Sequence, residues 1–275
     1  MKVYFIGAGP GAKDLITVRG ARYLAASDVV LYAGSLVPEE ILEHCHPKAV
    51  LVNTAGLDLD QQMEHYSDAK ARDVDVARVH SGDPAIYGAI SEQINRLNQA
   101  DISWEIVPGV SSFTAAAAEL GSELTKPNVS QTIILTRVSG RATAVPALES
   151  VALLAAHKST LCIFLSGPHL NKIVQELLLH YPPFTPVALV YRSTWPDRRE
   201  HRSTLEKLLT EIHINDWTLT TMLIVGAVLA IDLDVASSLY SKNYTHKFRK
   251  ARQRKDNLID LSEAVSQENI QETDQ

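Results

Sequence analysis

The residue types best suited to binding a ligand lie in three glycine-containing loops, each after an apolar segment. These loops are residues 7–12 (GAGPGA), 81–87 (SGDPAIY) and 108–112 (PGVSS). Glycine lets a ligand approach the backbone closely. The third loop leads into a predicted helix, whose free N–H groups favour a carboxylate. Together the loops indicate a binding site for a small polar ligand.

Each loop also has a purely structural interpretation. The first is explained by a tight turn after a strand, and the third by ordinary capping of the helix that follows it. Asp83 is suited either to meeting a cationic group of a ligand or to forming an Asx-turn before Pro84. The residue types alone leave both interpretations of each loop open.

The first loop matches the loose dinucleotide pattern G-x-G-x-x-G/A, but its details disfavour NAD or FAD. Pro10 removes a backbone N–H where a pyrophosphate needs donors. The next helix is expected near Thr17 rather than directly after the glycines. No acidic residue ends the second predicted strand, where a ribose partner is expected. The loop therefore favours a ligand without a pyrophosphate.

No metal site and no catalytic nucleophile is predicted. His44, Cys45 and His46 are adjacent, so their side chains point in different directions and are better explained by the end of a helix. The chain has no G-x-S-x-G elbow and no P-loop lysine. The catalytic residues stay unassigned.

Apolar, β-prone runs alternate with amphipathic stretches, which predicts an α/β fold with mainly parallel sheets. We expect a first α/β domain over residues 1–122, a second over 123–232, and a polar, partly disordered tail over 233–275. The expected strands are 2–8, 28–32, 49–53, 74–80, 104–107, 131–136, 160–165, 186–191 and 221–229. The expected helices are 17–26, 86–97, 111–120, 145–156, 169–180 and 203–212. Ligands of such sheets lie at the carboxyl ends of strands, where the three loops fall.

Composition is that of a soluble globular protein. The chain has 275 residues, 45% of them hydrophobic and 21% charged, and a net charge of −6, which gives no indication of nucleic-acid binding. It has no apolar run long enough to cross a membrane and no signal-peptide pattern. Two cysteines cannot form a disulfide framework, so we expect a cytoplasmic protein. The charge is uneven, with six Lys or Arg over 247–255 and five acids over 260–275.

The order of six segments gives a more specific indication. They read FIGAGPGAKDLITVRG, VLYAGSLVP, HSGDPAIYG, VPGVSSFTAAAAELG, SQTIILTRVSGRA and LVYRSTWPDRREHRSTL, and this series resembles the tetrapyrrole methylase family. The resemblance covers residues 2–231. It implies two α/β domains with S-adenosyl-methionine in a cleft between them, which is not the Rossmann methyltransferase fold. The GPG and SGDP loops are family-wide, whereas YAGSLV and QTIILTR are typical of the branch that methylates precorrin-4 or cobalt-precorrin-4.

The resemblance implies roles for individual residues. The expected cofactor-binding residues are Pro10, Ser81, Gly82, Asp83, Ile86, Ser111, Ser112, Leu165, Ser193 and Thr221. The implied substrate carries acetate and propionate side chains, so arginines are expected to hold it. The candidate substrate-binding residues are Arg137, Arg141 and Arg192. A solvated surface charge is the alternative for each arginine.

The activity implied is methyl transfer to carbon 11 of the corrin precursor, with S-adenosyl-L-homocysteine as product, by a homodimer that binds neither nucleic acid nor membrane. Alternatives inside the family are another precorrin carbon, a uroporphyrinogen or a ribosomal RNA ribose. The uroporphyrinogen branch is disfavoured because Ala33, Gly34 and Ser35 follow Tyr32, where that branch has an aspartate. A non-catalytic nucleotide-binding module is the alternative from another class.

Overall fold

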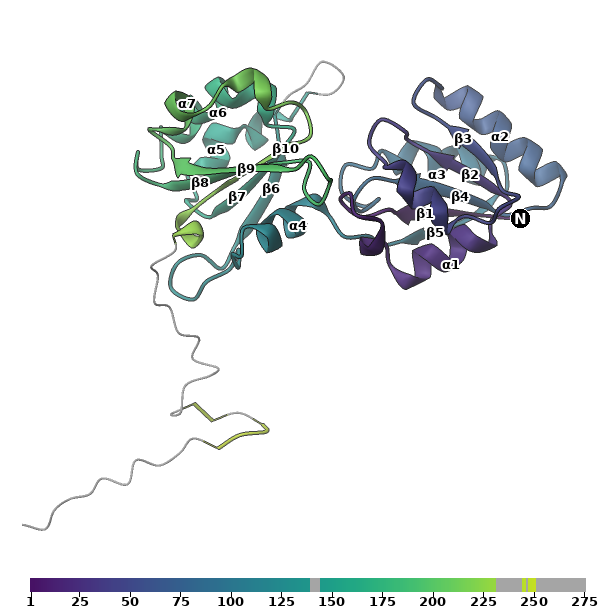
Figure 1. Cartoon of the computed structure of the whole chain (residues 1–275), viewed down its shortest axis with the longest axis horizontal. Helices are drawn as coiled ribbons and strands as arrows, with labels where there is room; N and C mark the ends of the chain where they lie inside the picture. Colours follow the sequence, from purple (N-terminus) through teal and green to yellow (C-terminus); the bar gives the residue numbers. More distant parts are fainter. Residues whose placement is uncertain (139–143, 231–243, 246, 251–275) are drawn as a thin grey trace, which may run out of the picture. The chain divides into compact units, whose positions relative to one another are not determined.

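A computed structural model describes residues 1–138, 144–230, 244–245 and 247–250. Residues Met1–Leu233 group into one compact unit. Its described part contains two five-stranded sheets, one built before residue 108 and one after residue 132 (Figure 1). Arg141 and nearly all of the expected tail, 233–275, lie outside the described residues.

The first sheet is entirely parallel, in the strand order β3-β2-β4-β1-β5. Its strands are β1 (Lys2–Gly7), β2 (Val29–Tyr32), β3 (Val50–Asn53), β4 (Val76–His80) and β5 (Ser103–Val107). All five residues of β4 are buried, as expected for a central parallel strand. Because β1 lies between β4 and β5, the loops that follow these three strands meet at one edge. All five strands were predicted, each within two residues of its observed bounds.

The helices of the first half are α1 (Val18–Ala26), α2 (Leu59–Ala71), α3 (Ile90–Gln99) and α4 (Ser112–Glu119), with 3-10 turns at Lys13–Leu15 and Glu39–His44. Two of these four helices, α1 and α2, begin at side-chain caps. Thr17 caps α1 by accepting the Gly20 N–H at 3.1 Å, as predicted. The sequence prediction missed α2, which starts at a capping box between Asp58 and Gln61.

The second sheet is mixed, in the order β6-β7-β10-β8-β9. Its strands are β6 (Ile133–Arg137), β7 (Thr160–Phe164), β8 (Pro186–Tyr191), β9 (Arg199–Thr204) and β10 (Thr221–Val225). Only β6 and β7 pair in parallel; β7–β10, β10–β8 and β8–β9 are antiparallel. Over both sheets of the described chain, five of eight pairings are parallel, so the α/β class with mainly parallel sheets is confirmed.

The helix predicted over 203–212 is wrong at its start. Residues Arg199–Thr204 pair with all six residues of β8 and form the edge strand β9, and helix α7 is only Leu208–Glu211. The other helices are α5 (Val151–Ala155) and α6 (Leu170–Leu177), with 3-10 turns at Ala147–Glu149, Gly167–His169, Ile214–Asp216 and Ala227–Leu229. Pairing with β8 decides the conformation of a polar segment whose own pattern indicated a helix.

Helix α4 follows the first sheet along the chain but packs against the second. Its Ala116 and Ala117 lie in one buried cluster with Cys162 of β7, Ala188 of β8 and Ile224 of β10 (Figure 1). The opposite face of that sheet packs against α5 and α6. The chain therefore crosses between the two sheets just before α4, at the third glycine loop. The domain boundary expected between residues 122 and 123 stays a prediction.

Candidate active site

Three glycines bring the ends of β1, β4 and β5 into direct backbone contact. A Cβ atom on Gly109 would lie 2.1 Å from the carbonyl oxygen of Gly82, and one on Gly7 would lie 2.6 Å from the Gly109 Cα. Gly9 and Gly82 exchange two backbone hydrogen bonds, of 3.2 and 2.8 Å. Any side chain at these contacts would push the loops apart, so the three loops form one junction.

Asp83 holds this junction through backbone groups. Its Oδ1 accepts the Ala85 N–H at 2.8 Å, and its Oδ2 accepts the Gly109 N–H at 3.0 Å. The first bond is the Asx-turn that the sequence left open, and the second ties the SGDP loop to the PGVSS loop. Both carboxylate oxygens thus position the loops, and a cationic partner for Asp83 is absent from the described residues.

The loop between β8 and β9 connects the second half to the first glycine loop. Trp195 Nε1 donates to the Pro10 carbonyl at 2.9 Å, and Thr194 Oγ1 accepts the Ala12 N–H at 2.9 Å. Glu119, at the end of α4, holds the same loop: its two oxygens accept the Ser193 hydroxyl at 2.7 Å and the Thr194 N–H at 2.9 Å. The sequence prediction did not single out Glu119, since its partners lie more than 70 residues away.

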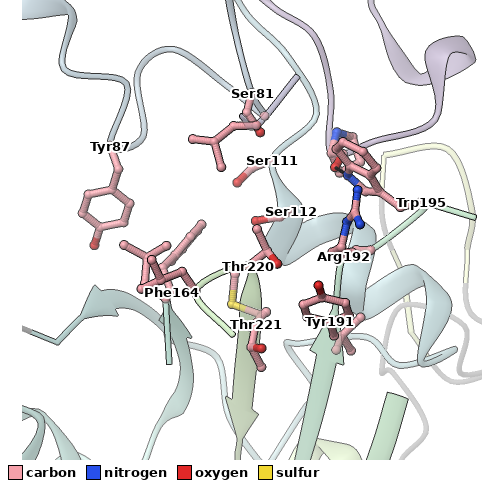
Figure 2. A pocket seen from close by; sticks show the side chains of 18 of the residues that line it. Ser81, Tyr87, Ser111, Ser112, Phe164, Tyr191, Arg192, Trp195, Thr220 and Thr221 are labelled. Atoms are coloured by element: carbon pink, nitrogen blue, oxygen red, sulfur yellow. Dashed lines mark hydrogen bonds between the residues drawn. The ribbon is translucent and has the colours of Figure 1, made fainter. Parts of the chain in front are cut away.

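A cavity of about 490 Å³ opens where these loops meet (Figure 2). It is lined by residues from both halves of the chain. Every described residue that the sequence named for cofactor or substrate is among them: Pro10, Ser81, Gly82, Asp83, Ile86, Ser111, Ser112, Arg137, Leu165, Arg192, Ser193 and Thr221. Their roles stay predictions, but the structure brings them to one site. The sequence missed the aromatic lining residues Tyr87, Phe164, Tyr191 and Trp195.

Aromatic side chains form two sides of the cavity. Tyr87 and Phe164 contact edge to face, with ring centroids 5.0 Å apart, and the Arg137 guanidinium lies 5.9 Å from the Tyr87 ring. On the other side, the Arg192 guanidinium lies 3.9 Å from the Trp195 ring (Figure 2). Tyr87 is in the quoted segment HSGDPAIYG and Trp195 in LVYRSTWPD, so their motifs were visible even though their roles were not.

The two described arginine candidates differ in their environment. Arg192 Nη1 pairs with Asp197 Oδ2 at 2.6 Å, in addition to its stacking on Trp195. Arg137 has a buried Nε atom with no hydrogen-bond partner in the described residues. An uncompensated buried donor is costly unless a ligand satisfies it. Arg137 is therefore the better candidate for holding a substrate carboxylate.

The pKa values of two tyrosines that line the cavity, Tyr87 and Tyr191, are shifted in opposite directions. Burial raises the pKa of Tyr87 from its ordinary value. Hydrogen bonding with Thr218, together with the nearby charge of Arg192, lowers the pKa of Tyr191. Tyr191 is thus the more acidic of these two phenols that line the cavity.

Three non-glycine residues of the lining adopt a left-handed backbone. Tyr87, Leu165 and Arg192 have φ of 56°, 55° and 46°. Such a conformation costs on the order of 1–3 kcal/mol for each residue and persists where the surrounding structure enforces it, commonly at ligand sites. The strain falls on the three segments that carry the aromatic and basic lining, which supports a binding role for this cavity.

The cavity offers groups for a ligand with both a carboxylate and apolar parts. Ser111 is the N-cap of α4 but its side chain makes no capping bond, so N–H groups of the first turn face the site without that acceptor. Thr221 Oγ1 is buried and has no partner in the part of the chain described. Ile86, Leu165 and Met222 supply apolar surface. These features fit S-adenosyl-methionine.

The first glycine loop does not lead directly into a helix, as expected. A 3-10 turn, Lys13–Leu15, separates the first glycine loop from α1, so the loop does not open a helix toward a pyrophosphate. The interpretation of His44, Cys45 and His46 as a helix end is confirmed. Cys45 is the C-terminal cap of the 3-10 turn Glu39–His44, and His44 Nε2 lies 3.1 Å from the Lys13 carbonyl oxygen.

Comparisons with known proteins agree with this fold and site. The model of the family described as Tetrapyrrole (Corrin/Porphyrin) Methylases matches residues 2–209. The chain therefore belongs to the tetrapyrrole methylase family. It is 51% identical over 249 residues to the precorrin-4 C(11)-methyltransferase of Pseudomonas aeruginosa, covering 90% of this chain and 99% of that one.

The solved structures similar to this one include two methyltransferases. A cobalt precorrin-4 methyltransferase of cobalamin biosynthesis matches with a TM-score of 0.80 and 43% identity, over 83% of this chain and 96% of its own. A uroporphyrin-III C-methyltransferase from Thermus thermophilus, complexed with S-adenyl homocysteine, matches with a TM-score of 0.71 and 26% identity, over 83% and 99%. The protein is a methyltransferase of the tetrapyrrole type. No helix among the described residues is long and apolar enough to span a membrane.

Proposed function

We propose that this protein transfers the methyl group of S-adenosyl-methionine to carbon 11 of precorrin-4 or cobalt-precorrin-4 in cobalamin biosynthesis. One observation carries the proposal: a single cavity, at the junction of three glycine loops, gathers every described residue that the sequence assigned to cofactor and substrate. The identities to relatives with this activity extend over nearly the whole chain and support the choice of substrate.

The cofactor is held by backbone and small side chains in this proposal. The N-terminus of α4, at Ser111 and Ser112, receives its carboxylate, since the unpaired N–H groups and the helix dipole favour an anion there. Gly82, with φ of 66°, places backbone rather than a side chain against it. Leu165 and Ile86 line the cavity and would contact its apolar parts. The bound cofactor supplies a methyl group on a positively charged sulfur, which is a good leaving group.

The protein contributes mainly alignment, because the nucleophile is an electron-rich carbon of the substrate. The residues of the cavity would hold that carbon near the methyl group of the bound cofactor. Such positioning supplies roughly 7–11 kcal/mol of a reaction barrier in favourable cases. Tyr87 and Phe164 provide apolar surface for a flat macrocycle, and Arg137 provides a charge for one of its carboxylates. No side-chain nucleophile is required, which agrees with the absence of a nucleophile motif.

We further propose a cytoplasmic homodimer that binds neither nucleic acid nor membranes. Both cysteines, Cys45 and Cys162, are free thiols, which supports a reducing compartment. Light scattering of the purified protein tests the dimer, and a monomeric mass would contradict it.

The deciding experiment is methyl transfer with labelled S-adenosyl-methionine to the metal-free and the cobalt-loaded substrate. NMR of the product locates the new methyl group. A methyl group at carbon 11 of either substrate supports the proposal, and the better substrate assigns the pathway. A methyl group on another carbon, methylation only of a uroporphyrinogen, or cofactor binding without turnover would overturn it.

A further inference from the structure

A second cavity of about 340 Å³ lies beside the proposed active site. The two cavities have three lining residues in common, Leu36, Ser81 and Tyr87. The second cavity is lined in addition by Arg78 and His80, both on the central strand β4. A large substrate whose reacting carbon lies in the first cavity therefore reaches the second by passing Ser81 and Tyr87.

Arg78 is a buried arginine without an acidic partner. Its residue is only 6% exposed. Nε donates to Gln93 Oε1 at 3.2 Å and Nη1 donates to Thr54 Oγ1 at 3.0 Å, while Nη2 has no partner in the described chain. No carboxylate among the described residues forms an ion pair with it. Arginines are almost never fully buried unless they are paired. The buried charge of Arg78 therefore indicates that a bound anion pairs with it.

His80 adds a second unsatisfied group to the same cavity. It is 7% exposed, and its Nε2 has no hydrogen-bond partner among the residues described. Burial and the neighbouring Arg78 lower the pKa of His80 to about 3, so its ring is neutral at pH 7. A neutral imidazole donates one hydrogen bond without adding charge.

The other polar lining residues do not neutralise Arg78. Glu92 lines the cavity but is exposed, so water screens its charge. Gln62 Nε2 donates to the Leu57 carbonyl at 3.2 Å, which leaves its buried Oε1 as an acceptor. The polar partners of Arg78 are neutral: Gln93 and Thr54.

The local packing does not require Arg78. Gln93 Oε1 also accepts the Tyr66 hydroxyl at 3.3 Å, and Thr54 Oγ1 also donates to the Tyr32 carbonyl at 3.2 Å. Both groups therefore keep a partner when the guanidinium is removed. Replacing a buried charge by an apolar side chain of similar size is often neutral or stabilising. The buried charge of Arg78 is therefore not required for the stability of the fold, which indicates a role in ligand binding.

We propose that the cavity at Arg78 and His80 binds one carboxylate side chain of the macrocyclic substrate and thereby fixes which ring carbon faces the methyl group. This inference rests on the proposed function, which supplies a substrate with several carboxylates. The two donors are the free Nη2 of Arg78 and the Nε2 of His80. His80 donates in the neutral tautomer that carries its proton on Nε2. Arg137 then binds a different carboxylate of the same substrate.

The test compares Arg78→Met and Arg78→Lys with the wild type in titrations of substrate and of S-adenosyl-homocysteine. Arg78→Met should weaken substrate binding about tenfold to a hundredfold, as expected for one hydrogen-bonded charge pair, with cofactor-product affinity unchanged. Arg78→Lys should recover part of the loss. Arg96→Met, which removes a surface arginine paired with Asp60, is the matched control and should change neither affinity.

A methyl-esterified substrate separates binding from a structural effect. If Arg78 holds a carboxylate, the difference between wild type and Arg78→Met should vanish when the substrate carboxylates are esterified, and His80→Gln should show the same pattern with a smaller loss. Equal substrate affinity in wild type and Arg78→Met, or a difference that persists with the ester, would overturn the inference. A wild type that binds cofactor product but methylates neither substrate would refute the proposed function instead.

Discussion

Replacing Gly109 by alanine tests the glycine junction most directly. Gly109 has no left-handed φ, so the substitution adds only a methyl group. That group would lie 2.1 Å from the Gly82 carbonyl oxygen, and both neighbours within 3 Å are backbone of other loops. Ordinary contact begins near 3.4 Å, so the two loops must separate by roughly 1.3 Å.

The separation has two costs. Overpacking of this kind costs about 1–3 kcal/mol. Displacing Gly109 also weakens its N–H bond to Asp83 Oδ2, and a hydrogen bond to a charged group contributes about 1.5–3 kcal/mol. We expect a total loss of about 2.5–6 kcal/mol in the free energy of unfolding. Because Ser81, Ser111 and the N-terminus of α4 move with these loops, methyl transfer should fall by about a hundredfold.

Urea denaturation measures the stability loss, and isothermal titration with S-adenosyl-homocysteine measures the loss of binding. The matched control is Gly56→Ala, since a Cβ on Gly56 meets no atom within 4 Å. Gly56→Ala should leave both measurements unchanged. Wild-type stability and wild-type affinity in Gly109→Ala would refute the view that backbone contact between these loops builds the cofactor site.

Substitutions at three further residues test other parts of the site. Glu119→Ala removes the acceptor of the Ser193 hydroxyl and the Thr194 N–H, so it should lower the free energy of unfolding by about 2–4 kcal/mol in urea denaturation and weaken cofactor binding. Glu119→Gln should lose less stability. Equal stability of the two variants would contradict this role of Glu119. Arg137→Ala should weaken substrate binding far more than cofactor binding in parallel titrations, and equal or absent effects would remove Arg137 from the substrate site. His80 lowers the stability of the fold in acid, because its ring takes up a proton near pH 6.5 in the unfolded chain but only near pH 3 in the folded chain. The contribution of neutral His80 to the free energy of unfolding is complete above pH 6.5. It should fall by about 2 kcal/mol between pH 7 and pH 5. His80→Gln should flatten the pH profile of the unfolding free energy over that range, whereas a profile as steep as that of the wild type would show that other groups cause the slope.

Local signals accounted for most of the first half of the fold. The apolar, β-prone run of β1, the buried run of β4 and the cap at Thr17 each act within a few residues, so the sequence predicts them. Helix α2 was missed because only Tyr66 and Ala69 of its thirteen residues are buried, which leaves little apolar periodicity. Its capping box between Asp58 and Gln61 was the signal available.

The second sheet shows where local signals fail. The segment Arg199–Thr204 is polar on both faces, and its six pairings with β8 make it a strand. Helix α4 is alanine-rich, which predicts a helix but not the sheet that it covers. Both outcomes depend on residues distant in sequence, whose pairing a local pattern does not record.

By itself, the sequence determined which loops carry the site and which ligand classes are unsuitable. The informative residues were the glycines after apolar strands, the serines at a helix start and the proline in the first loop. Each of them acts on the backbone conformation near itself, so a local sequence pattern is enough to predict its effect. The family resemblance then named twelve lining residues that the structure describes, and all of them face one cavity.

Only the tertiary structure decided what each charged side chain does. It assigned both oxygens of Asp83 to backbone N–H groups, paired Arg192 with Asp197, and left the buried charge of Arg78 without an acidic partner in the described residues. Whether a charge is compensated depends on burial and on neighbours brought together by folding, and both are non-local quantities. Residue types therefore located the site, and packing determined which of its charges remain for a substrate.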